Sequence, residues 1–287
     1  MKLNLEDITF IIVTYQSEDI IDDCLSSLPK VSKKIIVENS DNINLKNDLE
    51  AKYDNIEVIN SKNIGMGAGN NIGLKFCKTN FAYILNPDTK LHENTMFNLL
   101  ETLNEVSDFT LASPINDDQN IPNYKQIKKS TNLNRNVLSV GSIDGFSMLV
   151  NLNKFKDKLY FDENFFLYLE NDDLCLRVKN KNENIYIIKN SLINHKGGIS
   201  KNSKLEYLRN WHWMWSKFYF NKKHYGFIKA FASCLPDNFI NLLQLLVYII
   251  YKPSRAKYKY FKFEGFLCSL FGLPAFKRSL YDKENFY

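Results

Sequence analysis

The fold is decided near the amino end of the chain, where residues 8–41 read ITFIIVTYQSEDIIDDCLSSLPKVSKKIIVENSD. Residues 8–13 are a continuous run of β-branched and aromatic side chains, which is typical of a strand buried on both faces. Ser17 can cap a helix in which apolar side chains recur at helical spacing until Pro29 ends it. A second strand is expected at 34–37. The stretch therefore predicts parallel strands joined by a right-handed helical crossover.

The same alternation continues along the first half of the chain. Further strands are predicted at 56–59, 81–85 and 109–112, and helices at 45–52, 67–78 and 92–104. Short connections between such elements predict an α/β fold with a mostly parallel central sheet that is flanked by helices.

The pattern changes after Pro114. Residues 116–136 are polar and aperiodic, as in a surface loop. We then expect a strand at 145–150, a buried aromatic stretch at 160–168, a helix at 170–180 and a last strand at 185–188. From residue 203 the chain is basic, aromatic and helical in pattern. We therefore predict two domains, 1–202 and 203–287, of which the second is a helical extension.

Composition excludes several classes of protein. The 287 residues include 45% apolar side chains, 37 Lys and Arg and 32 Asp and Glu, so the formal net charge is +5. This mixture is typical of a folded protein with a substantial core and excludes a disordered or coiled-coil chain. So small a surplus does not indicate nucleic-acid binding.

The cysteines and the apolar segments predict a cytoplasmic protein. The five cysteines are scattered, include no C-x-x-C pair and favour buried thiols in a reducing compartment. The amino end lacks the pattern of a signal peptide. The longest apolar run, 239–251, has about a dozen residues where about 20 are needed to cross a bilayer, so no membrane-spanning helix is expected.

Polar side chains gather where the predicted strands end. The ends at 14–16, 38–41, 60–71 and 86–89 are all polar, and several carry acceptor side chains. In an open parallel sheet, ligands bind beyond the carboxyl ends of the strands. One polar end is explained by loop polarity alone, but four at one edge indicate a ligand site.

The third of these ends is rich in glycine and reads NIGMGAGNNIG at 63–73. Backbone N–H groups exposed at the start of a helix suit phosphate, although close packing of the helix on the sheet also requires glycine. A dinucleotide-binding G-x-G-x-x-G follows the first strand, whereas this run follows the third. The sequence argues against both a nicotinamide-binding domain and a P-loop.

Three further positions carry candidate chemistry. Pro87 ends a strand and presents Asp88 at the sheet edge, where a carboxylate beside a phosphate loop suits a divalent cation. Residues 170–173 place three carboxylates in the first turn of a helix, where they either complement the helix dipole or supply a general base. His195 follows the last strand and is either a surface residue or a metal ligand.

Taken together, the motifs resemble the family 2 glycosyltransferases of the GT-A fold, especially their bacterial rhamnosyltransferase-like branch. In chain order they are IIVTYQ, IIVENS, N-x-G-x-G-x-G-N-N-x-G, YILNPD, GFSM, FFLYLENDDLCLR and H-x-x-G-x-S. They cover about residues 8–200. Each is weak alone, but the set in this order is specific to the family, although not to a substrate.

The resemblance implies an inverting transferase that uses a nucleotide-diphosphate sugar and a divalent cation, Mg²⁺ or Mn²⁺. It implies that Asp88 and His195 hold the metal. It also implies donor contacts from Thr14 and Tyr15 in the nucleotide pocket, Glu38 on the pyrimidine edge, Asn63 and Gly65 beside the nucleoside, Asn70 and Asn71 near the phosphates or sugar, and Asn86 in the metal motif. Gly145, Phe146 and Met148 would separate donor from acceptor.

Three positions depart from the family pattern. Gln16 stands where Asn is usual, and Glu38 where the shorter Asp is common. The acidic pair that supplies the general base is interrupted by Asn171, which cannot accept a proton as a carboxylate does. We expect Glu170 to deprotonate the acceptor hydroxyl, with Asp172 as the second choice.

The basic, aromatic extension has three interpretations. It packs on the first domain, forms a homodimer interface, or attaches the protein peripherally to the anionic inner face of the cell membrane. Attachment would suit a lipid-linked acceptor.

The predicted function is transfer of a sugar, with rhamnose as the first candidate, from a UDP- or dTDP-sugar to a saccharide or lipid-linked saccharide in cell-surface polysaccharide synthesis. One alternative is a catalytically impaired nucleotide-sugar-binding protein, which Asn171 favours. Another is a nucleotidyltransferase, which would need a basic glycine-rich loop after the first strand. Nucleic acid is not an expected partner.

Overall fold

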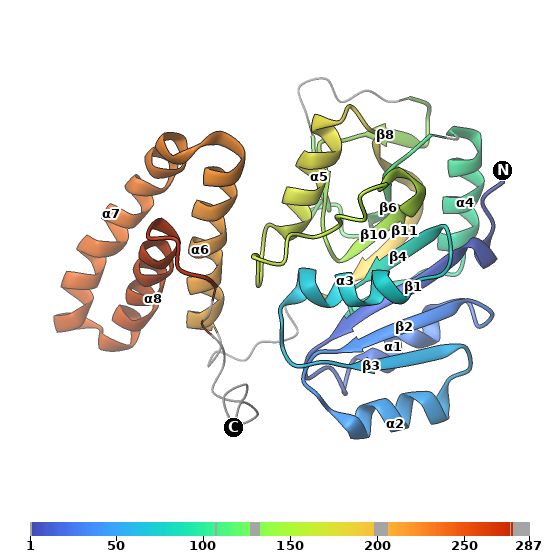
Figure 1. Ribbon diagram of the computed structural model, residues 1–287, viewed down its shortest axis with the longest axis horizontal. Helices are drawn as coiled ribbons and strands as arrows, with labels where there is room; N and C mark the ends of the chain where they lie inside the picture. Colours follow the sequence, from blue (N-terminus) through green and yellow to red (C-terminus); the bar gives the residue numbers. More distant parts are fainter. Residues whose placement is uncertain (1, 107, 127–132, 198–205, 276, 278–287) are drawn as a thin grey trace. The chain divides into compact units, whose positions relative to one another are not determined.

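The computed structural model describes residues 2–106, 108–126, 133–197, 206–275 and 277 (Figure 1). The chain forms two compact units. The sheet unit comprises Met1–Asp162 and Asn171–Ile199, and the helical unit comprises Glu163–Glu170 and Ser200–Tyr287. The domain boundary expected at residue 203 lies outside the described residues. The short segment 163–170 groups with the helices that follow it much later in the sequence.

The sheet unit is built on one mixed sheet. Its strands are β1 (Ile8–Thr14), β2 (Lys33–Glu38), β3 (Ile56–Asn60), β4 (Phe81–Leu85), β5 (Thr89–Leu91), β6 (Leu111–Asn116), β8 (Val137–Ser139), β10 (Ser147–Asn151) and β11 (Ile185–His195). The order is β3-β2-β1-β4-β10-β6-β11-β5, and β8 also pairs with β11. A separate pair is formed by β7 (Tyr124–Lys125) and β9 (Ser142–Ile143).

The predicted parallel strands are present, but the sheet is not parallel throughout. β1 is parallel to β2 and β4, β2 to β3, and β6 to β11. β10 runs antiparallel between β4 and β6, and β5 runs antiparallel to β11. The carboxyl ends of β1 to β4 therefore share one edge of the sheet with the start of β10.

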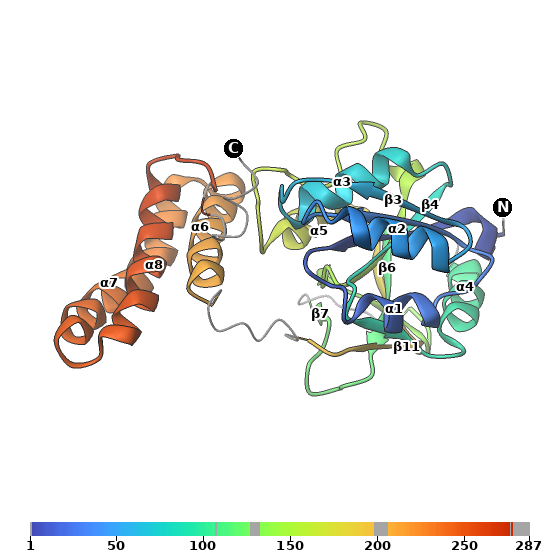
Figure 2. The ribbon, with the colours of Figure 1, turned by 90° about the horizontal axis from the view of Figure 1, so that it is seen from below.

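Helices cover both faces of the sheet (Figure 2). α1 (Ile21–Ser27), α2 (Ile43–Lys52) and α4 (Thr95–Val106) contribute to one core, and α3 (Met66–Phe76) and α5 (Glu170–Asn180) to the other. In β1, Phe10 and Ile12 belong to the first core, while Ile11 and Val13 belong to the second. The prediction of a strand buried on both faces is confirmed, because all seven residues of β1 are buried.

Three local expectations differ from the structure. α1 begins at Ile21, because the carbonyl of Ser17 accepts from the amides of Ile20 and Ile21 in a preceding turn and its side chain caps no helix. The one-turn helices η1 (Leu5–Asp7) and η2 (Leu152–Lys154) were not expected. The last strand, expected at 185–188, extends to His195, so His195 ends this strand and does not follow it. The other predicted helices and strands are present with ends shifted by a few residues.

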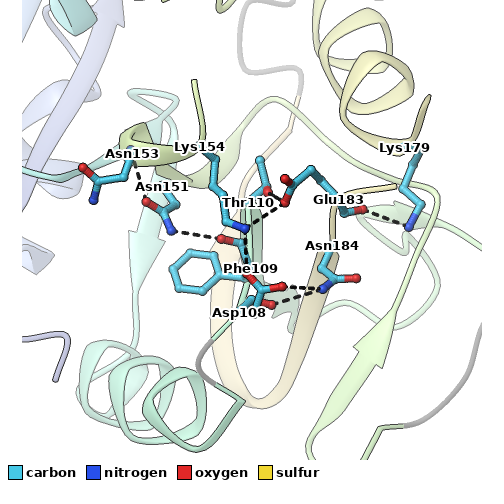
Figure 3. A network of polar contacts seen from close by, with 9 residues as sticks. All are labelled: Asp108, Phe109, Thr110, Asn151, Asn153, Lys154, Lys179, Glu183 and Asn184. Atoms are coloured by element: carbon cyan, nitrogen blue, oxygen red, sulfur yellow. Dashed lines mark hydrogen bonds and ion pairs between the residues drawn. The ribbon is translucent and has the colours of Figure 1, made fainter. Parts of the chain in front are cut away.

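A polar network ties together the opposite edge of the sheet, at the amino ends of β6 and β11 (Figure 3). Lys154 Nζ lies 2.7 Å from Asp108 Oδ1 and 3.0 Å from Glu183 Oε2. The Thr110 hydroxyl donates to Glu183 at 2.8 Å, and the Asn184 amide donates to Asp108. These pairs are partly exposed, so each contributes at most about 1 kcal/mol. They fix the edge that lies away from the candidate site.

The helical unit consists of α6 (Glu206–Tyr225), α7 (Phe227–Tyr251) and α8 (Pro253–Leu270) (Figure 1). A Cβ added at Gly265 of α8 would lie 2.3 Å from the carbonyl oxygen of Trp211 in α6, so the two backbones approach closely. α7 is longer than the apolar run in the sequence indicates. By length and composition it could cross a membrane, and only 17% of its most apolar window is buried.

The segment 163–170 packs on α6 through its aromatic side chains. The Phe165 ring contacts Tyr219 edge-on, with centroids 4.9 Å apart, and the Phe166 ring lies 4.6 Å from that of His212. The Ser216 hydroxyl, which is fully buried, donates to the carbonyl of Leu167 at 2.8 Å. The part of the aromatic stretch after Asp162 is therefore packed against a helix of the extension, whereas Phe161 belongs to the second core of the sheet unit.

The cysteines behave as the sequence predicts. All five are free, and four are buried while Cys77 is half-buried. Burial raises the pKa of Cys24 and of Cys175 to about 12, so these thiols stay protonated at neutral pH.

Candidate active site

The first three parallel strands end side by side. In the sheet register Thr14 lies opposite Glu38, and Glu38 opposite Asn60. Backbone hydrogen bonds continue past the strand ends, from Asn39 N to Thr14 O and from Ser61 N to Glu38 O, both at 2.8 Å. The structure thus brings together three of the four polar ends that the sequence singled out.

Glu38 is fully buried at this edge. Its Oε2 accepts from the Thr14 hydroxyl at 2.5 Å, and its Oε1 accepts from the Ser40 amide at 2.7 Å and from the Ser40 hydroxyl. These bonds fix the carboxylate between the ends of β1 and β2. A carboxylate has about four acceptor positions, but Glu38 has no exposed surface, so a nucleobase would reach it only after the side chains around it move. Contact with a base stays a prediction.

Asn39 joins this edge to the glycine-rich loop, a role that the sequence analysis missed. Its Nδ2 donates to Gly65 O at 3.2 Å, and its Oδ1 accepts from Ile64 N at 3.4 Å. Asn63 Oδ1 accepts from Gly65 N at 3.3 Å. Gly65 has a φ of 100° at the start of α3, a conformation that favours glycine. The polar run after Glu38 was the available signal for Asn39.

Two other glycines of the run serve packing. A Cβ at Gly69 would lie 2.9 Å from Val13 Cγ1, and one at Gly73 would lie 2.4 Å from Ile11 Cγ2. Both glycines therefore let α3 lie directly on β1. Close packing therefore explains the glycines at positions 69 and 73, whereas the positive φ explains Gly65.

The two neighbouring asparagines of α3 differ in their surroundings. Asn71 donates from Nδ2 to Phe161 O at 2.9 Å and accepts at Oδ1 from Phe161 N at 3.0 Å, so it fixes the chain at Phe161. Asn70 is 4% exposed, and its Oδ1 has no hydrogen-bond partner among the described residues. A buried acceptor without a donor suits a ligand hydroxyl or a water molecule.

The structure also brings Asp88 and His195 together. After β4 the chain turns at Pro87, and both the amide and the hydroxyl of Thr89 donate to Asn86 O. β5 then pairs with β11 so that Thr89 lies opposite His195. As a result, His195 Nε2 lies 3.4 Å from Asp88 Oδ1 although the two residues are far apart in the sequence.

Phe146 holds the His195 ring in place. The two rings stack with centroids 3.9 Å apart and an interplanar angle of 15°. The carbonyl of Phe146 accepts from Asn86 N at 2.9 Å, which links the start of β10 to the turn that carries Asp88. Phe146 was expected between donor and acceptor, and no sequence pattern indicated its stack on His195.

The pair of Asp88 and His195 fits a divalent cation. Two ligands bound at right angles, each about 2.1 Å from Mg²⁺, lie about 3 Å apart, close to the observed separation. The two side chains are 14% and 21% exposed, respectively, so the position between them is accessible. The described residues contain no group of three or more His, Cys, Asp and Glu side chains that could hold a metal. Phosphate oxygens and water would complete the shell.

The acids at the start of α5 are held in different ways. Both carboxylate oxygens of Asp172 accept from Lys125 Nζ at 2.7 Å. Asp173 is fully buried and pairs with Arg177 Nε at 2.9 Å, which is a structural contact. Asn171 Nδ2 donates to Ile143 O at 3.0 Å, a bond that an ionised carboxylate cannot donate.

Glu170 is the first residue of α5 and is 8% exposed. The two residues before it, Tyr168 and Leu169, have positive φ values of 72° and 66°. Bulky residues in this region cost of order 1–3 kcal/mol each, and such strain clusters at functional sites. Burial raises the pKa of Tyr168; the charge of Glu170 adds to that rise and Arg209 opposes it. Glu170 is thus a buried carboxylate at the end of a strained turn.

Asp144 is a second residue that the sequence analysis missed. Burial raises the pKa of its carboxyl, with a further contribution from Asp172, while Lys125 and His195 oppose the rise. Asp144 therefore lies within electrostatic range of both the metal pair and the acids of α5. Its position directly before the GFSM motif was the available signal.

The other predicted positions lie as follows. Tyr15 is half-buried at the end of β1, and Gln16 after it has a φ of 50°. A Cβ at Gly145 would lie 3.3 Å from Asn171 Cβ, so this glycine packs against α5. Met148 is fully buried in the second core. Gly198 and Ser200 of the last motif lie outside the described residues.

Comparison with known proteins identifies the family of the chain. Residues 9–194 match the family model described as glycosyl transferase family 2, which is well over half of the chain. The chain belongs to glycosyl transferase family 2. The resemblance inferred from the motifs is confirmed at the level of the family, whereas the rhamnosyltransferase-like branch is not shown.

One curated relative of this family 2 chain is the low-salt glycan biosynthesis hexosyltransferase Agl10 of Haloferax volcanii. It is 27% identical over 200 residues, which cover 63% of the present chain and 64% of the relative. The chain therefore spans slightly less than two thirds of the length of that relative.

Solved structures show the fold of this family 2 chain. The mannosyltransferase PcManGT from Pyrobaculum calidifontis, in complex with GDP-Man and Mn²⁺, matches 92% of the chain and 87% of its own length, with a TM-score of 0.57 and 10% identity. GalNAc-T7 with UDP, GalNAc and Mn²⁺ matches 67% of the chain and 44% of its own length, with a TM-score of 0.56 and 11% identity. The GT-A-like fold with a helical extension, expected from the motifs, is confirmed.

Proposed function

We propose that the protein is an inverting, metal-dependent hexosyltransferase that moves a sugar from a nucleotide-diphosphate donor to a saccharide or lipid-linked saccharide. The observation that carries the proposal is the meeting of Asp88 and His195 at 3.4 Å, on the sheet edge where β1, β2 and β3 also end. A carboxylate–imidazole pair at an edge where several polar strand ends gather suits a diphosphate bound through a cation.

The donor half of the site uses the strand ends. Thr14, Tyr15 and Glu38 would contact the nucleotide, Asn63 and Gly65 the nucleoside, and Asn70 and Asn71 the phosphates or sugar, with Asn86 beside the metal motif. Among these, Asn70 fits a sugar hydroxyl well, because its buried acceptor has no donor among the described residues. Asn71 also fixes the backbone of Phe161 and would contribute mainly through position.

Asp88 and His195 would hold Mg²⁺ or Mn²⁺, which supplies charge neutralisation for the departing diphosphate. Glu170 accepts the proton of the acceptor hydroxyl. The hydroxyl oxygen then forms a bond to the anomeric carbon as the bond from that carbon to the diphosphate oxygen breaks, and the displacement inverts the configuration. The electron pair of the broken bond leaves with the nucleoside diphosphate.

We assign the base to Glu170 and keep Asp172 as the second candidate. Both carboxylate oxygens of Asp172 already accept hydrogen bonds from Lys125 Nζ. This ion pair would have to be broken before the carboxylate takes a proton. Asn171 is no substitute, because its amide donates to Ile143 and has no basic oxygen.

The substrate is proposed by class. The curated relative is a hexosyltransferase of glycan biosynthesis, and the solved structures hold UDP with GalNAc or GDP-Man together with Mn²⁺. We propose a UDP- or dTDP-hexose donor, with dTDP-rhamnose tested first, and an acceptor in the assembly of a cell-surface polysaccharide.

A screen of nucleotide sugars tests the proposal. UDP-, dTDP- and GDP-sugars are mixed with the protein and Mn²⁺ or Mg²⁺, and melting temperature and release of nucleoside diphosphate are measured. A donor at a hundredfold its Kd adds about 2.7 kcal/mol, or roughly 5 °C in melting temperature for a chain of this size. Asp88→Asn should lose the metal-dependent part of the shift. No shift with any nucleotide sugar would contradict the proposal.

The alternative of a catalytically impaired nucleotide-sugar-binding protein rests on Asn171. It predicts that the donor raises the melting temperature, but that the protein neither transfers sugar to an acceptor nor slowly hydrolyses the donor. Release of nucleoside diphosphate that requires the metal would exclude it.

A further inference from the structure

α7 has the reverse of the polarity expected for a helix on a water-soluble protein. Its buried residues are small or polar, namely Ala230, Cys234, Asn238 and Asn241. Its large apolar side chains between Phe239 and Ile250 point outward, and each of the following is at least 48% exposed: Phe239, Ile240, Leu243, Leu246, Val247, Ile249 and Ile250. A surface helix in water turns its apolar stripe to the core. Polar side chains inside and apolar side chains outside are typical of helices in contact with lipid.

The inner polar side chains are engaged within the helical unit. Asn238 Nδ2 donates to Cys234 O at 2.7 Å, and Asn241 Oδ1 accepts from Lys259 Nζ of α8 at 3.3 Å. Ala230 and Cys234 belong to a core shared with residues of α6 and α8. The inner face of α7 is therefore committed to its two neighbouring helices, and its apolar face remains available to a partner.

The charge around α7 indicates the chemistry of that partner. Between residues 217 and 262 the chain has nine Lys and Arg but a single acid, Asp237. That acid already pairs with Lys217 at 2.5 Å. Exposed cations stand near both ends of α7, namely Lys222, Lys229, Lys252 and Arg255. The whole chain carries only +5, so the excess positive charge is concentrated here and is complementary to an anionic surface.

Aromatic residues and helix length indicate how α7 would meet a bilayer. Tyr225, next to its amino end, is 48% exposed, and Tyr251 at its carboxyl end is 76% exposed. Tyrosine is enriched at the boundary between hydrocarbon and water. α8 carries four Lys and Arg and packs on the inner face, so α7 cannot be surrounded by lipid without drawing these charges into hydrocarbon. Only the outward face is suited to lipid.

We infer that the outward face of α7 docks on an anionic lipid bilayer, with the helix in the plane of the interface and the flanking lysines and arginine on the headgroups. The inference goes beyond the proposed transfer reaction and does not depend on it, because it rests on the helical unit alone. If both hold, the acceptor is the lipid-linked member of its class, since an anchored enzyme meets acceptors that never leave the membrane.

Flotation of the full chain with vesicles tests the inference. The vesicles are phosphatidylcholine alone or equal parts of phosphatidylcholine and phosphatidylglycerol, at low and high salt. We expect binding to the anionic vesicles that weakens with salt. Leu246→Glu combined with Ile250→Glu should weaken binding at least about tenfold, because each change removes apolar burial and adds repulsion. Lys252→Glu combined with Arg255→Glu should abolish the preference for anionic vesicles.

Val31→Glu is the matched control, since Val31 of the sheet unit is 72% exposed and Ile250 is 74% exposed. It should bind vesicles as the unchanged chain does, and all variants should keep the same melting temperature without lipid. Protein that stays unbound with anionic vesicles at low salt would overturn the inference. So would an unaltered affinity of the Leu246 and Ile250 variant, or a homodimer in solution that the same variant dissociates. Nucleotide-sugar binding in each variant shows separately whether the donor site is intact.

Discussion

The two units of the chain treat apolar residues in opposite ways. β1 buries all of its residues between two helical layers, and its alternate side chains enter separate cores. α7 also has an apolar run, yet it buries Asn238 and Asn241 and exposes Phe239 and Ile250. The number of apolar residues in a run is therefore less informative about burial than the positions of the polar residues within it. Asp88 belongs to the sheet unit, and Glu170 ends the segment that belongs to the helical unit.

The largest expected effect separates these two acids. Glu170→Gln should reduce transfer by about 10²–10⁴-fold, because the acceptor hydroxyl loses its general base, while donor affinity stays nearly unchanged. Asp88→Asn should instead weaken metal-dependent donor binding. Turnover and donor affinity are measured for both variants, with Asp172→Asn as the comparison. Normal turnover by Glu170→Gln together with an inactive Asp172→Asn would move the base to Asp172.

The next largest effect is the loss of stability when a methyl group is added to a glycine at which two elements of one unit approach closely. Gly73→Ala places a Cβ 2.4 Å from the side chain of Ile11, and Gly265→Ala places one 2.3 Å from the backbone oxygen of Trp211. Overpacking costs typically 1–3 kcal/mol, and a backbone atom yields less readily than a side chain. We expect Gly265→Ala to lower the free energy of unfolding more than Gly73→Ala in urea titrations. An equal or reversed order would mean that α6 and α8 separate easily.

A smaller effect is expected where α6 holds the strained segment. Ser216→Ala leaves the carbonyl of Leu167 without this donor and should cost about 1–3 kcal/mol of stability. Because Leu167 precedes the turn at Tyr168 and Leu169, kcat should also fall while donor affinity does not change. Ser233→Ala is the control, since among the described residues its hydroxyl bonds within α7, to Ala230 O and to Cys234 beside it. If both variants lose kcat equally, α6 does not position Glu170.

The smallest effect concerns Asp144 and pH. Burial raises the pKa of its carboxyl above the ordinary value of 3.8. A raised pKa in the folded state contributes stability at pH values below 3.8, and that contribution is lost as the pH rises through the folded-state pKa. Asp144→Asn should therefore melt at a higher temperature than the unchanged chain at pH 7.5 in a chelator, and the difference should vanish in acid. A difference that grows as the pH falls would contradict this. Reduced transfer by the more stable variant would indicate that Asp144 serves the site.

Much of the sheet unit could be predicted from the sequence because its signals are local. The run at 8–13, the turn at Pro87 and the helix at 170–180 each depend on neighbouring residues, and all three are present. The antiparallel entry of β10 depends on pairing with β4 and β6, which lie far away in the sequence, and no local pattern encodes it. The length of α7 was underestimated, because polar residues within the helix interrupt the apolar run.

The site was predictable in part for the same reason. Strand ends are visible in a sequence, so the edge with Thr14, Glu38 and Asp88 could be expected. The bonds of Asp172 to Lys125 and of Asn171 to Ile143 join residues from different elements. The bond of Asp172 supports the proposal of Glu170 as the base, and only the folded chain shows these contacts.

The pairing of β5 with β11 determines when, during synthesis of the chain, the protein could first bind the proposed cation. Asp88 is synthesised early, but its partner His195 is the last residue of the last strand of the sheet. A nascent chain that has not yet added β11 would hold only half of the proposed cation site. Affinity for the cation would thus report that the sheet has closed, and the ion would stabilise the finished enzyme selectively over its incomplete precursors.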